Sequence, residues 1–240
     1  MKIAGVKTNY MKRIFLIISF LLPCIINAQV DKSFEGIITY KVKMDISADS
    51  SETSKMIVWM KDGFSKVQMD LESPTPMITI SNVKMNSMIQ LMDVEEYKFM
   101  MKYNLDSMTG ITKSVFSEVF KCDSDSKVIA GYFCKKAEII LVNKKLDNKY
   151  FKLMGDTLKY IVYYTEDIPV ADYNSPIKGM TKGYPLQIEA YMAGKIIMTE
   201  IAETVDKKIL PDSDFAIPAG YTEMSNDETK AIMQQIQSGH

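Results

Sequence analysis

Apolar and polar residues alternate with a period of two over much of this chain, and this pattern restricts the fold more than any other feature. From residue 38, the apolar set Ile38, Tyr40, Val42, Met44 and Ile46 alternates with Thr39, Lys41, Lys43 and Asp45. Successive side chains of a β-strand point to opposite faces, so the pattern predicts a long strand with one buried and one solvated face. Asp62-Gly63 lies between two further strand-like runs, 56–61 and 65–71, and favours a type I′ hairpin turn.

Further strand candidates follow along the chain at 77–83, 87–93, 97–103, 127–130, 133–143, 158–165, 186–192 and 195–205. Strands at this spacing, joined by short turns, predict a mainly β (α+β) fold. We expect one antiparallel sheet, strongly curved or half-open, with a few covering helices. No linker or shift of composition divides residues 29–225, which we interpret as a single domain.

Three stretches depart from the strand pattern. Between Asp106 and Cys122, apolar residues recur at steps of three and four, which predicts an amphipathic helix. The segment 166–183 is long for a connection and is a candidate lid over one side of the sheet. Residues 226–240 form a tail, in which we expect a short helix capped by Asn226 or Asp227.

The amino terminus has the pattern of a secretory signal peptide. Lys12-Arg13 precedes an apolar run of about ten residues, and Ala28 provides a small residue for cleavage. We therefore expect residues 1–28 to be removed, with Met11 as a possible true start. Export to the periplasm follows; an extracellular protein, or an outer-membrane lipoprotein acylated at Cys24, is the alternative. The apolar run is too short to span a membrane, and no second run follows.

The rarest residues exclude several classes of function. The only His is the last residue, His240, so triads and zinc sites that need an internal imidazole are not available. Arg13 is the only Arg, and the chain without residues 1–28 has a net charge of −5. The planar guanidinium that recognises guanine and phosphate would then be absent. We expect a protein that is not an enzyme, with no catalytic residue, no metal, no cofactor and no nucleic-acid partner.

Two cysteines remain after the signal segment, Cys122 and Cys134. In an exported protein such a pair is compatible with a disulfide. Two separately placed free thiols are equally compatible, because sequence alone does not show whether the Cα atoms lie within bridging distance. Both interpretations are open at this point.

Five ordered motifs resemble an exported family of domains of unknown function, the DUF4412-like proteins of Gram-negative bacteria. The motifs are Phe34-Glu35-Gly36-x-Ile38-x-Tyr40, Ile129-Ala130-Gly131-Tyr132-x-Cys134, Tyr163-Tyr164-Thr165-Glu166-Asp167-Ile168, Gly183-Tyr184-Pro185-Leu186 and Phe215-x-Ile217-Pro218-x-Gly220-Tyr221. The resemblance runs from about residue 33 to residue 224 and is more distant for GLPGLI proteins. Such families are similar to the LolA/LolB-like superfamily, which implies a half-open barrel that holds acyl chains. The Arg that helps to control the LolA cavity has no counterpart in the mature chain, so lipoprotein shuttling does not carry over.

Methionine is concentrated in the first half of the chain. Of 19 Met residues, 11 lie between Met44 and Met108. Met is flexible and polarizable, so a surface lined with it adapts to apolar ligands of varied shape, although filling a core is the default use of the residue. The candidate ligand-binding residues are Trp59, Met88, Met92, Phe99, Met101, Val115, Phe116 and Val119.

These observations lead to two hypotheses. The first is an exported, non-enzymatic protein that binds a lipid or another apolar small molecule in the concavity of a curved sheet. The second is a structural or interaction module of the cell envelope, with a filled core and a surface that contacts another envelope protein.

Overall fold

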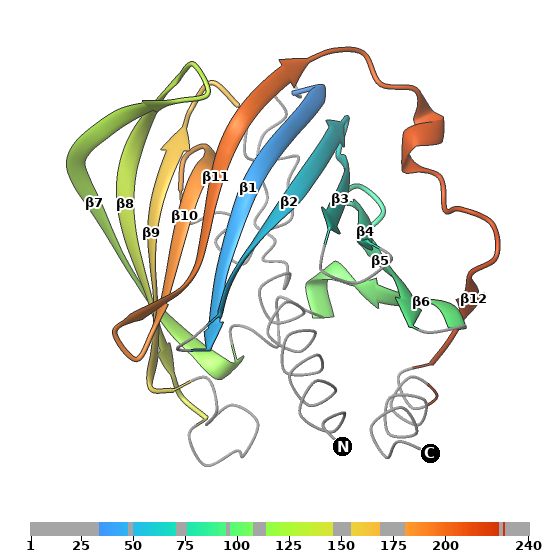
Figure 1. The fold of residues 1–240 in the computed structure, drawn as a ribbon, viewed down its shortest axis with the longest axis horizontal. Coiled ribbons are helices and arrows are strands. Elements are labelled where there is room, and N and C mark those ends of the chain that lie inside the picture. The colour runs from blue at the N-terminus through green and yellow to red at the C-terminus, as the bar shows by residue number, and fades with distance from the viewer. Residues whose placement is uncertain are drawn as a thin grey trace.

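The computed structural model describes residues 34–47, 50–70, 76–94, 97–107, 114–145, 155–168 and 181–225, together with residue 228. These residues form one large sheet (Figure 1). Its strands are β1 (Gly36–Ser47), β2 (Ser50–Lys61), β3 (Phe64–Asp70), β4 (Met77–Asn82), β5 (Ser87–Val94), β6 (Tyr97–Asn104), β7 (Phe116–Ile129), β8 (Tyr132–Asn143), β9 (Thr157–Thr165), β10 (Tyr184–Met192), β11 (Lys195–Lys207) and β12 (Thr222–Glu223).

The spatial order of the strands is β12-β6-β5-β4-β3-β2-β1-β11-β10-β9-β8-β7. All neighbours are antiparallel except β12 and β6, which run parallel. The chain therefore builds the sheet outward from β1 to β6, continues at the opposite edge with β7, and returns strand by strand to place β11 beside β1. The expected mainly β fold with one large curved antiparallel sheet is confirmed.

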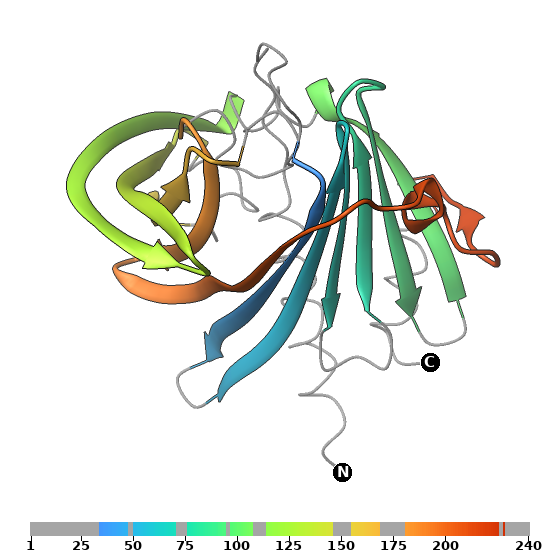
Figure 2. The same cartoon turned by 90° about the horizontal axis from the view of Figure 1, so that it is seen from above.

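The curvature is strongest at the β7–β11 end. Figure 2 shows these strands curling round, while β1 to β6 spread outward in a flatter array. β7 also contacts β11, although three strands separate the two in the sheet. One buried apolar cluster joins side chains of β1–β4 to side chains of β7–β11, so these side chains lie on the concave side.

We call this concave side the inner face and define it by Ile38, Tyr40, Val42 and Met44 of β1. All four are at most 4% exposed, whereas the alternating Lys41 and Lys43 are exposed. Residues directly opposite each other across two strands share a face, so the register carries this definition to every strand. The predicted alternation of β1 is thus present through Met44.

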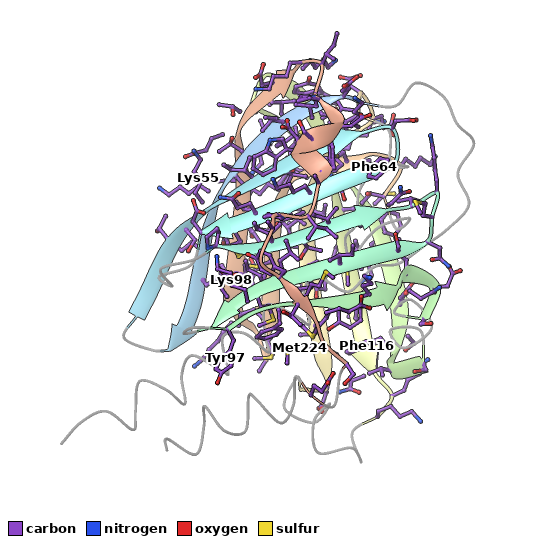
Figure 3. All side chains as sticks on the ribbon, turned by 90° about the vertical axis from the view of Figure 1, so that its right-hand side faces the viewer. Lys55, Phe64, Tyr97, Lys98, Phe116 and Met224 are labelled. Atoms are coloured by element: carbon purple, nitrogen blue, oxygen red, sulfur yellow. The ribbon has the colours of Figure 1, made fainter. Side chains whose placement is uncertain are left out.

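The opposite, outer face of β3–β6 is covered by the chain itself. After β11, residues 208–223 cross this face and include the short 3-10 helix η2 (Asp212–Phe215). Phe215 packs against Phe64 with ring centroids 5.7 Å apart, and Lys61 Nζ donates to the Leu210 carbonyl at 2.6 Å. Figure 3 shows this segment running over the sheet from the level of Phe64 to Met224. The crossing segment ends in β12, which pairs with β6 at the edge of the sheet.

The helix expected over 106–122 is wrong in its second half. Residues from Phe116 onward form β7, which pairs with β8 from Phe116 opposite Asn143 to Ile129 opposite Tyr132. The apolar residues at steps of three and four are β-branched or aromatic, and they find cross-strand partners: Val119 lies opposite Ile140, and Phe120 opposite Ile139. Tertiary pairing therefore prevails over the local periodicity. Residues 108–113 lie outside the described residues.

Hairpin turns agree with the sequence. Asp62 and Gly63 have φ of 45° and 84°, as a type I′ turn requires.

At the start of the tail, the Ser225 hydroxyl accepts a hydrogen bond from the Glu228 amide at 3.3 Å, and the Glu228 carboxylate accepts one from the Ser225 amide at 2.8 Å. This reciprocal pair is a capping box with Ser225 in the N-cap position. Asn226 and Asp227, the expected caps, lie outside the described residues. The rest of the expected tail helix, the signal segment 1–28 with Cys24, and loop residues 169–180 lie outside the described residues.

Candidate functional site

The inner face is rich in methionine. Cross-strand register places Met44 of β1 opposite Met198 of β11, and lines up Met56, Met69 and Met77 on three neighbouring strands. All of these side chains are buried. The complete inner-face set on β1–β6 and β11 is Met44, Met56, Met60, Met69, Met77, Met88, Met92, Met101 and Met198. The methionines that cluster in the sequence therefore gather mainly on one face of the sheet.

Four polar side chains interrupt this face on β3–β5: Ser65, Thr79, Ser81 and Gln90, each at most 4% exposed. The Ser65 and Ser81 hydroxyls lie 2.6 Å apart and form a hydrogen bond, and Gln90 Nε2 donates to the Met77 sulfur at 3.5 Å. A buried polar group costs little when it is paired. The partners are hydroxyl, amide and thioether groups, so this part of the face has hydrogen-bonding capacity without a charge.

Glu200 places an acidic side chain on the inner face of the central strands, among apolar and uncharged polar side chains. It lies on β11 directly opposite Val42 of β1 and Ile188 of β10. Met198 and Ala202, its inner-face neighbours along β11, are 5% and 4% exposed, whereas Glu200 itself is half-buried. Desolvation by these apolar neighbours raises the pKa of the Glu200 carboxyl to about 7. A carboxylic acid that changes charge near neutral pH thus lies among apolar side chains.

Two tyrosines lie near this carboxyl. Tyr40 donates from its hydroxyl to the Pro185 carbonyl at 2.9 Å, and Tyr184 is hydrogen-bonded to Tyr40. Burial raises the pKa of Tyr184 far above its ordinary value, and the nearby charge of Glu200 contributes in the same direction. The Tyr184 phenol is therefore a neutral hydrogen-bonding group at physiological pH, whereas the Glu200 carboxyl titrates near neutrality.

The residues predicted from sequence divide between the two faces. Met88, Met92, Phe99 and Met101 lie together on the inner face of β5 and β6 and are at most 5% exposed. Val115 and Phe116 belong to the main buried cluster, at the start of β7. Trp59 and Val119 do not join them. Trp59 lies on the outer face of β2 beneath the Lys66 ammonium, 4.9 Å from the ring centroid, and Val119 is 43% exposed.

Residues 34–221 match the family described as a domain of unknown function, DUF4412. The chain belongs to the DUF4412 family. The matched region runs from the residues before β1 to residue 221, just before β12. No protein of curated function matches the sequence.

Among solved structures, the DUF4412 chain is similar to PNGF-II, with a TM-score of 0.53 and 18% identity. That match covers 85% of this chain but only 33% of PNGF-II, so the chain spans about a third of that protein's length. A LolA superfamily protein from Nitrosomonas europaea matches with a TM-score of 0.37, 10% identity and coverage of 78% and 92% of the two chains. Mycobacterium tuberculosis lipoprotein LppX matches with a TM-score of 0.35 and 9% identity, and the match covers 73% of this chain and 89% of LppX. The PNGF-II likeness supports the fold alone, and the two lower scores are too small to support an inference about function.

The motifs that resemble the DUF4412 family lie mainly at turns and anchoring points. A Cβ on Gly183 would lie 2.0 Å from the Thr165 carbonyl oxygen, and one on Gly36 would lie 2.3 Å from the Asp206 carbonyl oxygen. Glu35 accepts from the Leu210 amide at 2.8 Å, which ties the chain before β1 to the segment after β11. Gly36, Gly183 and Glu35 therefore contribute to the shape of the sheet, whereas Tyr40 and Tyr184 of the same motifs lie beside Glu200 on the inner face.

The DUF4412 sheet contains two free thiols, of which Cys122 is exposed and Cys134 is buried. Cys122 lies opposite Ala137, and Cys134 lies opposite Lys127, on the two sides of an irregularity in the β7–β8 register. The two residues are thus not cross-strand neighbours. Of the two interpretations that the sequence left open, the structure has the separate thiols.

We expect the two thiols to differ sharply in reactivity with Ellman's reagent. In protein beginning at Gln29, at pH 8 and without reductant, Cys122 should react within minutes. Cys134 should react only after denaturation, because it is 0% exposed and burial raises the pKa of its thiol to about 11. A Cys122→Ser variant should lose the fast phase alone. Absence of any titratable thiol before reduction would contradict the structure and indicate a disulfide.

The described part of the chain contains no group of three or more His, Cys, Asp or Glu side chains placed to hold a metal ion. Within the same residues we find no helix with the length and apolar character that a membrane crossing requires. The described inner face of the central strands carries thioethers, aliphatic and aromatic groups, hydroxyls and the Glu200 carboxyl.

Proposed function

We propose that this DUF4412 protein is an exported, non-enzymatic protein whose inner face binds a lipid or another apolar ligand. The observation that carries the proposal is the register of the sheet, which gathers nine Met side chains on one concave face. Met side chains have three rotatable bonds and a polarizable sulfur, so a face made of them adapts to chains of different length and shape. Apolar sites with a few polar groups are the usual form of small-molecule pockets.

The proposed location follows from the signal-like segment at residues 12–28. We place the protein in the periplasm, with lipidation at Cys24 or secretion as alternatives. An apolar carrier or sensor in such a compartment needs no catalytic residue, which agrees with the sequence: the single His is residue 240.

The first experiment is to purify the protein natively from its exported fraction, extract it with organic solvent and identify bound molecules by mass spectrometry. We expect an amphiphile in about equimolar amount. A fluorescent fatty-acid probe should then bind to the delipidated protein and be displaced by the extracted ligand. Protein that carries no extractable amphiphile and binds no apolar probe would contradict the proposal.

A matched pair of variants locates the binding surface. Met100 and Met101 are adjacent on β6, but Met101 lies opposite Gln90 on the inner face and Met100 lies opposite Leu91 on the outer face. We expect the triple variant Met88→Leu/Met92→Leu/Met101→Leu to weaken probe binding several-fold, because Leu has about the same volume but less freedom to adapt. Stability should fall by less than about 1.5 kcal/mol per site. The control Met100→Leu should leave probe binding unchanged; equal effects would place the site elsewhere.

The alternative function is an interaction module, and one observation favours it. Val128 and Phe133 lie opposite each other next to the β7–β8 turn and are 68% and 57% exposed. Paired exposed apolar side chains at an edge strand are suited to contact with another protein. If the inner face binds no apolar probe, while Phe133→Ser abolishes co-purification of a discrete envelope protein, this function replaces the first.

A further inference from the structure

We propose that the inner face binds an amphiphile with a cationic head, a quaternary ammonium or protonated amine, and that Glu200 pairs with it. The inference rests on the proposed function, because the apolar part of the ligand needs the surrounding inner face. It adds the class of head group and the residue that selects it.

The register fixes the position of Glu200. The side chain projects from β11 between Val42 and Ile188, and its neighbours along the strand are Met198 and Ala202. These four residues are at most 9% exposed, whereas Glu200 is half-buried and keeps access from outside. Glu200 is therefore a partly exposed acidic residue within an apolar surface, with the Tyr40 and Tyr184 phenols as its polar neighbours.

No hydrogen bond or ion pair joins Glu200 to another residue of the described chain. On β1, the inner-face residues nearest in register are Tyr40, Val42 and Met44; Lys41 and Lys43 alternate to the outer face. On β10, the corresponding residues are Leu186, Ile188 and Ala190. The other acidic residue of this strand, Glu189, lies on the outer face, where its carboxylate accepts hydrogen bonds from Gln187 and Tyr191. The titratable groups that face Glu200 from these strands are thus the phenols of Tyr40 and Tyr184.

This environment selects the charge of the ligand. An ionised carboxylate among apolar groups is costly unless it is paired, and an ammonium supplied by the ligand provides the missing partner. A neutral head group would leave the carboxylate uncompensated, and a phosphate or sulfate head would repel it. An apolar chain lying against the methionines and an ammonium at Glu200 would satisfy both parts of the surface at once.

Binding of such a cation also depends on pH in a defined way. Desolvation raises the pKa of Glu200 to about 7, so the carboxyl of the free protein is mostly protonated below that pH. A cation pairs with the ionised form, so each bound ligand displaces one proton at low pH. We therefore expect the affinity to fall about tenfold per pH unit below 7 and to level off above it.

The test compares two probes with the same twelve-carbon chain by isothermal titration below their micelle concentrations. Dodecyltrimethylammonium has a fixed positive charge, and octaethylene glycol monododecyl ether is neutral. At pH 8 we expect the wild-type protein to bind the cation at least tenfold more tightly than the ether. Glu200→Gln should bind both probes alike, and the preference of the wild type should vanish at pH 5. The control Glu203→Gln, an exposed residue of the same strand, should keep the preference.

The outcomes separate the two proposals. If both probes bind equally to the wild type, or if Glu200→Gln keeps the preference, the head-group inference is overturned and apolar binding stands. If neither probe binds to a protein that melts cooperatively by circular dichroism, the apolar site fails and the head-group inference fails with it.

Discussion

Replacing Glu200 with Gln is expected to raise the free energy of unfolding by about 3 kcal/mol at pH 8 and to leave it almost unchanged at pH 4. In the folded protein, desolvation raises the carboxyl pKa to about 7 from an ordinary value of 4.5. Between these two values the folded state keeps a proton that the unfolded state has released. The wild-type protein therefore loses stability as pH rises from about 4.5 to about 7, and the loss is complete above the folded pKa.

Gln has the shape of the protonated acid but does not titrate, so its stability curve lacks this loss. The measurement is urea denaturation of both proteins at pH 4, 5, 6, 7 and 8, with the difference between them taken at each pH so that other carboxyls cancel. Glu203→Gln, on the same strand but exposed, should change stability by less than about 0.5 kcal/mol at every pH. If the free energies of unfolding of the wild type and Glu200→Gln differ by the same amount at every pH, the carboxyl is solvated or paired in the folded protein.

The inward position of Glu200 does not follow from the sequence alone. In the sequence of β11, apolar residues occupy both parities, Ile197, Ile201 and Val205 at odd positions and Ile196, Met198 and Ala202 at even positions, so alternation alone does not say which face Glu200 is on. The structure has irregularities opposite both ends of this stretch, between Ala190 and Tyr191 on β10 and between Thr39 and Tyr40 on β1. An irregularity of this kind shifts the alternation by one residue, so Ile201 is 36% exposed and Glu200 faces inward.

The parts that sequence predicts well depend on local chemistry. The alternation along β1 and the Asp62-Gly63 turn each follow from a few adjacent residues, and both are present. For residues 116–122 the apolar spacing predicts a helix, but the strand that pairs with them, β8, lies beyond a turn, so a short stretch of sequence does not reveal it. Met88, Met92 and Met101 share one face because β5 and β6 are adjacent in the sequence and in the sheet, so alternation along each strand determines their relative positions.

Trp59 lies apart from the inner-face candidates for a different reason. It alternates with Val58 and Met60, which are inner-face residues, so its own position was already determined by parity. Composition suggested a ligand-binding aromatic residue, but parity places its ring on the outer face beside Lys66. For a sheet, the alternation is therefore better evidence of a site than the kind of residue.

Gly183→Ala is expected to be the most destabilising single-methyl change in the described chain, with a loss of about 4 kcal/mol or failure to fold. The added Cβ would lie 2.0 Å from the Thr165 carbonyl oxygen and 2.5 Å from its carbon, which are backbone atoms and cannot rotate away. Relief would require β9 and β10 to separate where Tyr184 pairs with Thr165. Tyr184 and Pro185 would move as a result, and both belong to the hydrogen-bonded surroundings of Glu200.

A matched variant isolates this contact from the general cost of replacing glycine. Gly194, in the turn between β10 and β11, has a φ of 76°, and a Cβ there would meet no atom within 4 Å. Gly194→Ala should cost only the 1–2 kcal/mol of an L-residue in the left-handed region, about half the loss at Gly183 or less. Thermal and urea unfolding of both variants measure the difference. If the two substitutions cost the same, the β9–β10 contact is looser than the structure has it, and the fixed position of Tyr184 beside Glu200 is lost with it.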